Sequence, residues 1–273
     1  MKKECGERGI YPDSMLRVGL IGCGAIGSVV ARELSQGAMH GVELAAVLDP
    51  VVHHPLGVDD RESLLSRSDV VVEAAGHAAL REHGVAVREA GTDLLVVSIG
   101  ALADGDLEAR LRQAEGGRLF LCTGAIGGFD ILRAAMLFGP LEEVAITSTK
   151  PAMALSRPWM DETIQDALAH GTEPVTVFDG PAREACALFP ESANVTATLS
   201  LATVGFDHVR VQMVGDPAAT RVRHVVAASG EAGTYELSFE NAASPDNPRT
   251  SAVTAYSVLR AVGDIRRPSV SFL

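Results

Sequence analysis

The sequence predicts an α/β protein with a parallel sheet in its first half and a second, α+β domain after it. Three observations support this fold class. Apolar strands alternate with helices in the first half, a glycine-rich turn joins the first strand to the first helix, and residues 209–240 contain strands without helices between them. Alternation is typical of a parallel sheet covered by helices, whereas consecutive strands indicate antiparallel pairing.

The strands of the first half are nearly continuous runs of Val, Leu and Ile. Such runs are expected where helices cover both faces of a parallel sheet. The predicted strands are Leu16–Ile21, Val42–Leu48, Asp69–Ala74, Asp93–Ser98 and Arg118–Cys122. The predicted helices are Ala25–Gln36, Glu62–Arg67, His77–Ala90 and Asp106–Ala114.

The pattern changes after about Thr123. The elements predicted first are a strand at Val144–Thr149, a helix at Met160–Ala169, a strand at Val175–Phe178, and helices at Arg183–Leu188 and Asn194–Val204. Three strands follow, Val209–Val214, Arg221–Ala227 and Thr234–Glu240, which we expect to form an antiparallel meander. The last predicted helix, Ser251–Val262, is expected to return and cover the first sheet.

These elements predict two domains. Residues 15–123 and 250–273 form the first, residues 124–249 form the second, and residues 1–14 are a flexible extension. The meander offers a sheet face or edge that pairs across a two-fold axis, so we expect a homodimer.

The turn after the first strand reads Gly22-Cys-Gly24-Ala25-Ile26-Gly27. Gly22 suits the tight turn, Gly24 lets the backbone approach a pyrophosphate, and Gly27 lets the helix pack close to the strand. Ala25 and Ile26 begin the helix, whose free N–H groups and positive dipole end would face that phosphate. The alternative is a glycine-rich turn without a ligand. Because a strand precedes the motif and a helix follows it, we interpret it as a Rossmann-type site for a dinucleotide, and the lack of further flavin signals favours a nicotinamide.

The second strand ends in Asp49, about 20 residues beyond the last glycine, where a ribose 2′-hydroxyl is usually held. A carboxylate there favours NAD because it would repel the 2′-phosphate of NADP. Residues 50–57 contain no Arg to accept that phosphate, although His53 and His54 leave NADP possible.

Small residues also occupy two later strand ends. Ala75 and Gly76 follow the third strand, and Ala125 lies in the linker Cys122–Asp130. Such residues suit the carboxyl edge of the sheet, where a cofactor lies close to the backbone. For the linker, a hinge between domains is the alternative.

Composition limits the partners. The 273 residues carry a net charge of −12, which argues against nucleic acid and anionic membrane surfaces. No apolar run is long enough to cross a bilayer, and residues 1–14 lack the apolar segment of a secretory signal. The four cysteines have no metal-ligand spacing, so we predict no metal site and free thiols in the cytoplasm.

Several segments of the second half resemble the L-aspartate dehydrogenase family. They are TGAIGGFD (123–130), TKP (149–151), FDGPAREA (178–185), FPESANVTATL (189–199), DPAATR (216–221) with His224, and DNPRTS (246–251). The resemblance extends from Leu16 to Arg260. It implies a homoserine-dehydrogenase-like arrangement of domains and NAD(P)-dependent interconversion of L-aspartate and iminoaspartate, which hydrolyses to oxaloacetate and ammonia. This activity can feed the biosynthesis of pyridine nucleotides or the breakdown of aspartate.

The resemblance also implies site residues. His224 matches the catalytic position, and an imidazole with a pKa near neutrality can deprotonate the substrate ammonium or activate water. Lys150, Arg221 and Arg249 are expected to bind the substrate carboxylates, with Arg183 as a further candidate. Asn194 matches a family position at the head of a helix.

Alternatives remain for some of these residues. Asn194 either caps its helix or hydrogen-bonds the nicotinamide amide. His77, after the third strand, is a second candidate for the cofactor pocket. The chain departs from the family at Thr149, where a basic residue is usual, and at Val222, close to the usual position of an Asn.

Two other functions fit the same architecture. One is reduction of a C=N or C=C bond in a related dicarboxylate. The other is a non-catalytic sensor that binds NAD. A Lys- or His-rich motif would favour the reductase and a docking segment would favour the sensor, and neither is visible in the sequence.

Overall fold

The first lobe is built on a parallel sheet, as predicted. The computed structural model describes residues 15–244 and 250–266 of the chain. The strands are β1 (Leu16–Ile21), β2 (Val42–Leu48), β3 (Val70–Glu73), β4 (Asp93–Val96) and β5 (Leu119–Leu121), in the spatial order β2-β1-β3-β4-β5. All neighbouring pairs are parallel, so their carboxyl ends meet at one edge.

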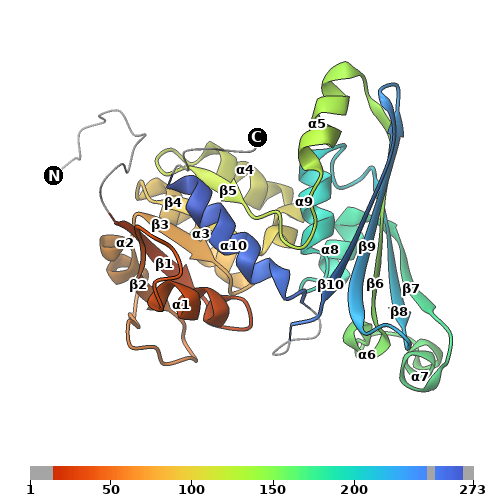
Figure 1. The fold of residues 1–273 in the computed structure, drawn as a ribbon, viewed down its shortest axis with the longest axis horizontal. Coiled ribbons are helices and arrows are strands. Elements are labelled where there is room, and N and C mark those ends of the chain that lie inside the picture. Colours follow the sequence, from red (N-terminus) through yellow and green to blue (C-terminus); the bar gives the residue numbers. More distant parts are fainter. Residues whose placement is uncertain (1–14, 245–249, 267–273) are drawn as a thin grey trace.

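Helices cover both faces of this sheet. One face packs against α1 (Gly27–Ser35) and α10 (Val253–Ile265), and the other packs against α2 (Arg61–Arg67), α3 (His77–Glu89) and α4 (Gly105–Gln113). Val258 and Val262 of α10 are fully buried in the same apolar cluster as Val30 of α1. The predicted return of the last helix is therefore confirmed, and Figure 1 shows α10 lying beside α1.

The second sheet is mixed. Its strands are β6 (Leu141–Pro151), β7 (Val175–Pro181), β8 (Val209–Asp216), β9 (Arg221–Gly230) and β10 (Gly233–Ala242), in the order β10-β9-β6-β8-β7. The central strand β6 runs parallel to β8 and antiparallel to β9. β9 and β10 form an antiparallel hairpin.

The predicted three-strand meander is wrong, because β6 lies between β8 and β9. A central strand needs hydrogen-bond partners along both edges, and β6 finds them in β8 and β9. The four-residue link 217–220 can pass the end of β6, because it reaches about 13 Å when extended and two strand spacings amount to about 10 Å.

Short helices lie between the two sheets and beside the second one. They are η1 (Ile99–Ala103), α5 (Phe129–Phe138), α6 (Ala152–Leu155), α7 (Glu162–His170), α8 (Ala182–Leu188) and α9 (Asn194–Ala202). Residues 195–200 of α9 are all buried, which is typical of a helix packed on every side. Because α9 packs against η1 and β8, it joins the two lobes.

The second sheet has one covered and one open face. Along β9, Val222, His224 and Val226 are buried, whereas Arg221 and Arg223 are exposed. Figure 1 shows α8 and α9 on one side of this sheet. Among the residues that the structure describes, no helix is long and apolar enough to cross a membrane.

Candidate active site

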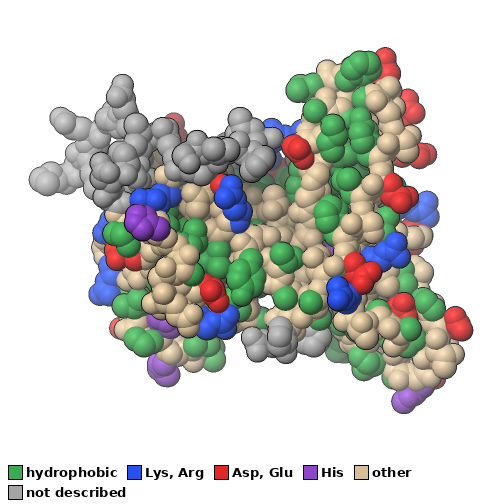
Figure 2. All heavy atoms as spheres, in the orientation of Figure 1, with side chains coloured by type: hydrophobic (Ala, Val, Ile, Leu, Met, Phe, Trp, Pro, Cys, Tyr) green, Lys and Arg blue, Asp and Glu red, His purple; other side chains and the backbone are tan. Residues whose placement is uncertain are grey.

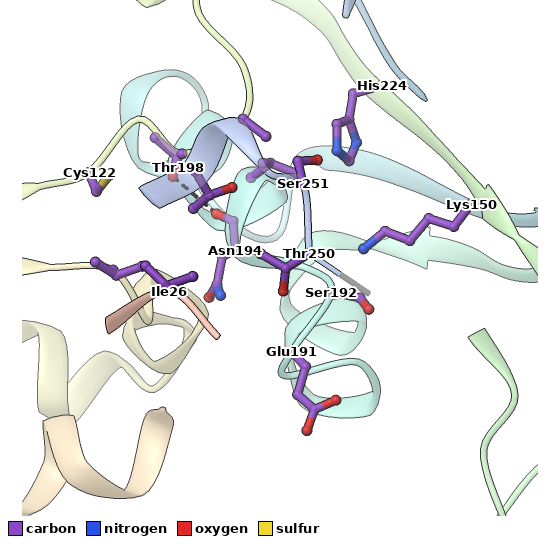
Figure 3. A pocket seen from close by; sticks show the side chains of 15 residues that line it. Ile26, Cys122, Lys150, Glu191, Ser192, Asn194, Thr198, His224, Thr250 and Ser251 are labelled. Carbon is purple, nitrogen blue, oxygen red and sulfur yellow. Dashed lines mark hydrogen bonds between the residues drawn. The ribbon is translucent and has the colours of Figure 1, made fainter. Parts of the chain in front are cut away.

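A pocket lies where the carboxyl edge of the first sheet meets the covered face of the second (Figure 3). The first lobe contributes Ile26 before α1 and Cys122 after β5. The second lobe contributes Lys150 at the end of β6 and His224 on β9, with Asn194 of α9 between the two lobes. The pocket therefore combines the predicted cofactor edge with two titratable side chains of the second sheet.

The glycine-rich turn leaves room beside the start of α1. Gly22 has φ +91°, and a Cβ there would lie 2.6 Å from Ala75, so only glycine fits. A Cβ on Gly27 would collide with the backbone carbonyl of Gly22. A Cβ on Gly24, in contrast, would meet no atom within 4 Å. With no acidic residue in its first turn and no side-chain cap, α1 presents this open space with free N–H groups, which suits a phosphate.

Asp49, directly after β2, is hydrogen-bonded to this turn. Its carboxylate accepts hydrogen bonds from the backbone N–H of Cys23 at 2.7 Å, of Val51 at 2.9 Å and of Val52 at 2.8 Å. Partial burial raises the pKa of the Asp49 carboxyl, but the three donors outweigh it and the pKa lies below its ordinary value. Asp49 is therefore a carboxylate at neutral pH, and one acceptor position remains beyond the three that the backbone uses.

Glu73 shapes the loops that carry Ala75 and Gly76. Its buried carboxylate accepts from the backbone N–H of both residues at 2.9 Å and from the Ser98 hydroxyl at 2.9 Å. Burial raises the pKa of this carboxyl although the hydrogen bonds oppose the shift. Glu73 therefore holds the loops after β3 and β4 together beside Gly22, a role that no motif of the sequence indicates.

Asn194 links the lobes beside the pocket. Its Oδ1 accepts the backbone N–H of Gly100 in η1 at 2.9 Å, and the α9 start has no side-chain cap. Of the two alternatives for Asn194, helix capping is therefore wrong. The ring of His77 lies on the same side of Gly100 as Asn194, since a Cβ on Gly100 would come within 2.7 Å of His77 Nε2 and 3.1 Å of Asn194 Oδ1. His77 is not among the described residues that line the pocket.

His224 and Ser148 form the buried centre of the second lobe. They lie directly opposite each other on β9 and β6, and Ser148 Oγ is 2.9 Å from His224 Nδ1. Both residues are almost completely buried, with exposed fractions of 0% for Ser148 and 2% for His224. Burial and then the nearby Lys150 lower the pKa of His224 to about 3, below the near-neutral value expected from the sequence.

Lys150 lies two residues beyond Ser148 on the same face of β6 and is 3% exposed. Burial, followed by the positive charge of Arg157, lowers the pKa of its amine to about 7, while Glu191 opposes the shift. Figure 3 shows Lys150 and His224 reaching into the pocket from the same side. The group of this pocket that titrates near neutrality is therefore Lys150.

The structure does not bring Arg221 or Arg183 to the pocket. Arg221 lies on the open face of β9, 3.7 Å from Glu240, because successive residues of a strand point to opposite faces and His224 points inward. Arg183 donates to Asp207 at 2.7 Å. Arg249 lies outside the described residues.

Comparison with known proteins identifies the family. Residues 22–118 match the model "Homoserine dehydrogenase, NAD binding domain", and residues 130–265 match "Aspartate dehydrogenase, C-terminal". The L-aspartate dehydrogenase of Pseudomonas aeruginosa is 41% identical over 266 residues, which cover 92% of this chain and 97% of that protein. The chain belongs to the L-aspartate dehydrogenase family.

Other members of the L-aspartate dehydrogenase family agree with this assignment. The enzyme of Cupriavidus necator is 38% identical over 92% of this chain and 97% of its own. The crystal structure of aspartate dehydrogenase from Thermotoga maritima superposes with a TM-score of 0.73 at 26% identity, covering 94% of this chain and 99% of that one. A dihydrodipicolinate reductase structure, at 14% identity and a TM-score of 0.52, shares the fold alone.

The two positions at which the sequence departs from the family pattern lie on opposite faces of the second sheet. Thr149 lies on the open face of β6, opposite in direction to Lys150, so it does not border the pocket. Val222 is fully buried on the same face as His224. Ser148 was not singled out from the sequence, although its spacing of two from Lys150 in a strand is a signal that both share one face.

Proposed function

We propose that the protein oxidises L-aspartate to iminoaspartate with NAD as hydride acceptor, and that iminoaspartate then hydrolyses to oxaloacetate and ammonia. The observation that supports this most is the juxtaposition of Lys150 and His224 in a pocket at the cofactor edge, in a chain 41% identical to an L-aspartate dehydrogenase. NADP remains a second possible cofactor.

The first lobe has the features needed to hold the dinucleotide. The open space at Gly24 and the free start of α1 fit the pyrophosphate, with Gly22, Ala25, Ile26 and Gly27 forming the cradle. The remaining acceptor position of Asp49 fits a ribose hydroxyl. When bound, the nicotinamide supplies a two-electron hydride acceptor.

Residues at the lobe junction fit the nicotinamide end. Ala75 borders Gly22 of the glycine-rich turn, and Gly76 follows it beside open space. Ala125 and Asn194 line the pocket. Asn194 Oδ1 is held by Gly100, which leaves its amide NH₂ group to face a carboxamide.

Lys150 and His224 act on the substrate in this proposal. When it carries a proton, the Lys150 amine attracts a substrate carboxylate, and the low polarity of its surroundings strengthens that attraction. His224 contributes acid–base chemistry at the reacting centre. Arg221, on the open face, does not fit the substrate-binding role in this protomer, and the role expected of Arg249 stays a prediction.

We further propose two domains, 15–123 with 250–273 and 124–249, and a homodimer. The open face of the second sheet supports the homodimer, as do the exposed apolar side chains of α5, which Figure 2 shows as a hydrophobic patch on the second lobe. Leu137 and Phe138 of α5 are 91% and 71% exposed. The buried free thiols of Cys23, Cys122 and Cys186 fit a cytoplasmic protein.

The function is tested by measuring NADH formation with a panel of the twenty amino acids. We expect L-aspartate to be the preferred substrate, with oxaloacetate and ammonia as products. An absence of amine-dependent NADH formation with every amino acid would contradict the proposal. In that case, NADH oxidation with a cyclic dicarboxylate imine would indicate a reductase, and dinucleotide binding without turnover would indicate a sensor.

A second question is whether the reaction feeds pyridine nucleotide biosynthesis. We propose that it does, because iminoaspartate is a reactive imine that a downstream condensing enzyme must capture before water does. A coupled assay with an imine-condensing enzyme should divert product from oxaloacetate. Unchanged oxaloacetate yield would indicate aspartate breakdown instead.

A further inference from the structure

The buried hydroxyl of Ser148 restricts which ring nitrogen of His224 carries the proton. Within the described parts of the chain, the hydrogen-bond partner of Ser148 Oγ is His224 Nδ1, at 2.9 Å. Ser148 is 0% exposed, so its O–H proton needs an acceptor inside the protein. If Nδ1 carried the ring proton, the imidazole would donate to Ser148 and the buried hydroxyl proton would lack an acceptor, which costs about 1–3 kcal/mol.

The opposite arrangement satisfies both groups. The Ser148 hydroxyl then donates to a bare Nδ1, and the ring proton of neutral His224 lies on Nε2. Because the pKa of His224 is lowered to about 3, the ring is neutral at physiological pH. His224 therefore presents an N–H donor at Nε2, and its other ring nitrogen, the acceptor, is occupied by Ser148.

Lys150 supplies the proton acceptor that His224 lacks while Ser148 occupies its Nδ1. It lines the same pocket and lies on the same face of β6 as Ser148. The charged groups that act on its amine are Arg157 and Glu191, and the neutral ring of His224 and the Cys122 thiol also border the pocket. With a pKa of about 7, the amine exchanges protons readily at physiological pH.

We propose that Ser148 holds His224 as an Nε2–H hydrogen-bond donor, and that Lys150 is the group that accepts the proton of the substrate ammonium. This inference rests on the proposed aspartate dehydrogenase function and divides its acid–base chemistry between two residues. Ser148 is a positioning residue that acts through His224, whereas Lys150 and His224 face the substrate.

The proton and electron balance of the step is simple. The neutral Lys150 amine takes one proton from the substrate ammonium and becomes an ammonium itself. The substrate nitrogen regains its lone pair, which forms the C=N bond as a hydride leaves Cα for the nicotinamide ring. The Nε2–H of His224 holds a substrate carboxylate during oxidation, and in the reverse direction it donates to the carbonyl oxygen of oxaloacetate.

The protonation of His224 can be read without turnover. Nitrogen-15 NMR of the ring nitrogens, assigned with His224→Gln, should show a proton on Nε2 and a bare, hydrogen-bonded Nδ1 in the resting protein at pH 7. The Ser148→Ala variant should lose the hydrogen-bond shift of Nδ1, and Ser148→Thr should restore it. A proton on Nδ1 in the wild type would overturn the assignment of His224.

Lys150 is tested with Lys150→Arg, which keeps the charge but cannot give up its proton near neutrality. Calorimetry with succinate, a dicarboxylate without an amine, should show binding to both proteins. Proton uptake on binding at pH 7–8 is expected only in the wild type. Turnover of L-aspartate should fall about 10²–10⁴-fold in Lys150→Arg. Retention of more than a tenth of the turnover, or equal proton uptake in both proteins, would overturn the role of Lys150.

Turnover of the His224 variants shows whether His224 acts as a hydrogen-bond donor or as a base. If His224 donates, His224→Gln, which keeps an N–H group, should retain more turnover than His224→Ala. Equal loss in the two variants would assign the base to His224. Ser148→Ala should lower kcat with little change in the KM for NAD, and Ser148→Thr should recover it. If the wild type does not oxidise aspartate at all, the proposed function fails, while the NMR and calorimetry still decide where the protons lie.

Discussion

At the scale of single residues, Asp49 has a structural role beside the cofactor role that we propose for it. Its three backbone hydrogen bonds join the glycine-rich turn to the segment after β2. The same carboxylate keeps one acceptor position that these backbone groups do not use. A substitution at Asp49 therefore changes both the shape of the turn and the charge that a 2′-phosphate would meet.

We predict that Asp49→Ser narrows the preference for NAD over NADP. The variant loses the hydrogen bond to the ribose and the repulsion of the 2′-phosphate, so KM should rise for NAD and fall for NADP. Asp49→Asn is the control, because it keeps the size of the side chain but not its charge. Steady-state kinetics with both cofactors check this, and a wild-type preference for NADP of tenfold or more would refute the role of Asp49.

The lowered pKa of His224 makes the free energy of unfolding depend on pH. The folded protein holds this imidazole with a pKa of about 3, whereas its ordinary value is 6.5. Between these values the unfolded chain binds a proton that the folded chain does not, so the free energy of unfolding rises with pH from about 3 to about 6.5. The contribution is on the order of a few kcal/mol. The lowered pKa of Lys150 changes the free energy of unfolding only above about pH 7, outside this pH range.

Urea unfolding at pH 5 and pH 7 checks this prediction. The wild type should lose stability at pH 5, and His224→Gln should show a smaller loss because no imidazole is buried. His208→Gln is the control, since His208 is exposed. If the free energy of unfolding changed equally between pH 5 and pH 7 in the wild type and in His224→Gln, the lowered pKa of His224 would be contradicted.

At the scale of elements, the turn between β1 and α1 is the proposed site of the dinucleotide pyrophosphate. Three glycines share the turn, but their surroundings differ. Gly22 and Gly27 are confined by Ala75 and by the Gly22 carbonyl, whereas Gly24 borders open space. A side chain on Gly24 therefore tests the cofactor site without disturbing the packing of α1.

We predict that Gly24→Val abolishes NADH binding and leaves the fold intact, because the branched side chain fills the space expected for the pyrophosphate. Gly105→Val is a matched control, since a Cβ on Gly105 also meets no atom within 4 Å but lies at the start of α4. NADH fluorescence titration and circular dichroism measure the two effects. Unchanged NADH binding in a folded Gly24→Val variant would show that the dinucleotide binds elsewhere.

At the scale of the whole molecule, the second sheet has a covered face that builds the pocket and an open face that does not. Ser148, Lys150 and His224 point to the covered face. Ala145 and Thr147 of the central strand point to the open face, where they are half-buried. Pairing of two open faces would leave the pocket unobstructed.

We predict that Ala145→Glu converts a dimer into a monomer, because two like charges would be buried near the axis of the paired sheets. Gln113→Glu on the exposed side of α4 adds the same charge outside the proposed interface and should remain dimeric. Light scattering after size-exclusion chromatography gives the mass. A dimeric Ala145→Glu protein would exclude the open face as the interface.

Features that depend on short-range patterns could be predicted from the sequence. The continuous apolar strands and the spacing of Gly22, Gly24 and Gly27 predicted the first sheet and its cradle, because local backbone geometry and burial on two faces leave a direct signature. The motifs of the second half identified the family. The returning helix α10 was also predicted correctly.

The order of the second sheet and the composition of the pocket could not be predicted in this way, because both depend on contacts between segments far apart in the chain. The position of β6 between β8 and β9 depends on hydrogen bonding between strands far apart in sequence, which no local pattern records. The same pairing places Ser148 against His224 and turns Arg221 to the opposite face. The protonation of His224 and Lys150 follows from burial, since the free energy of a charge depends on what surrounds it in space and not on its neighbours in the chain.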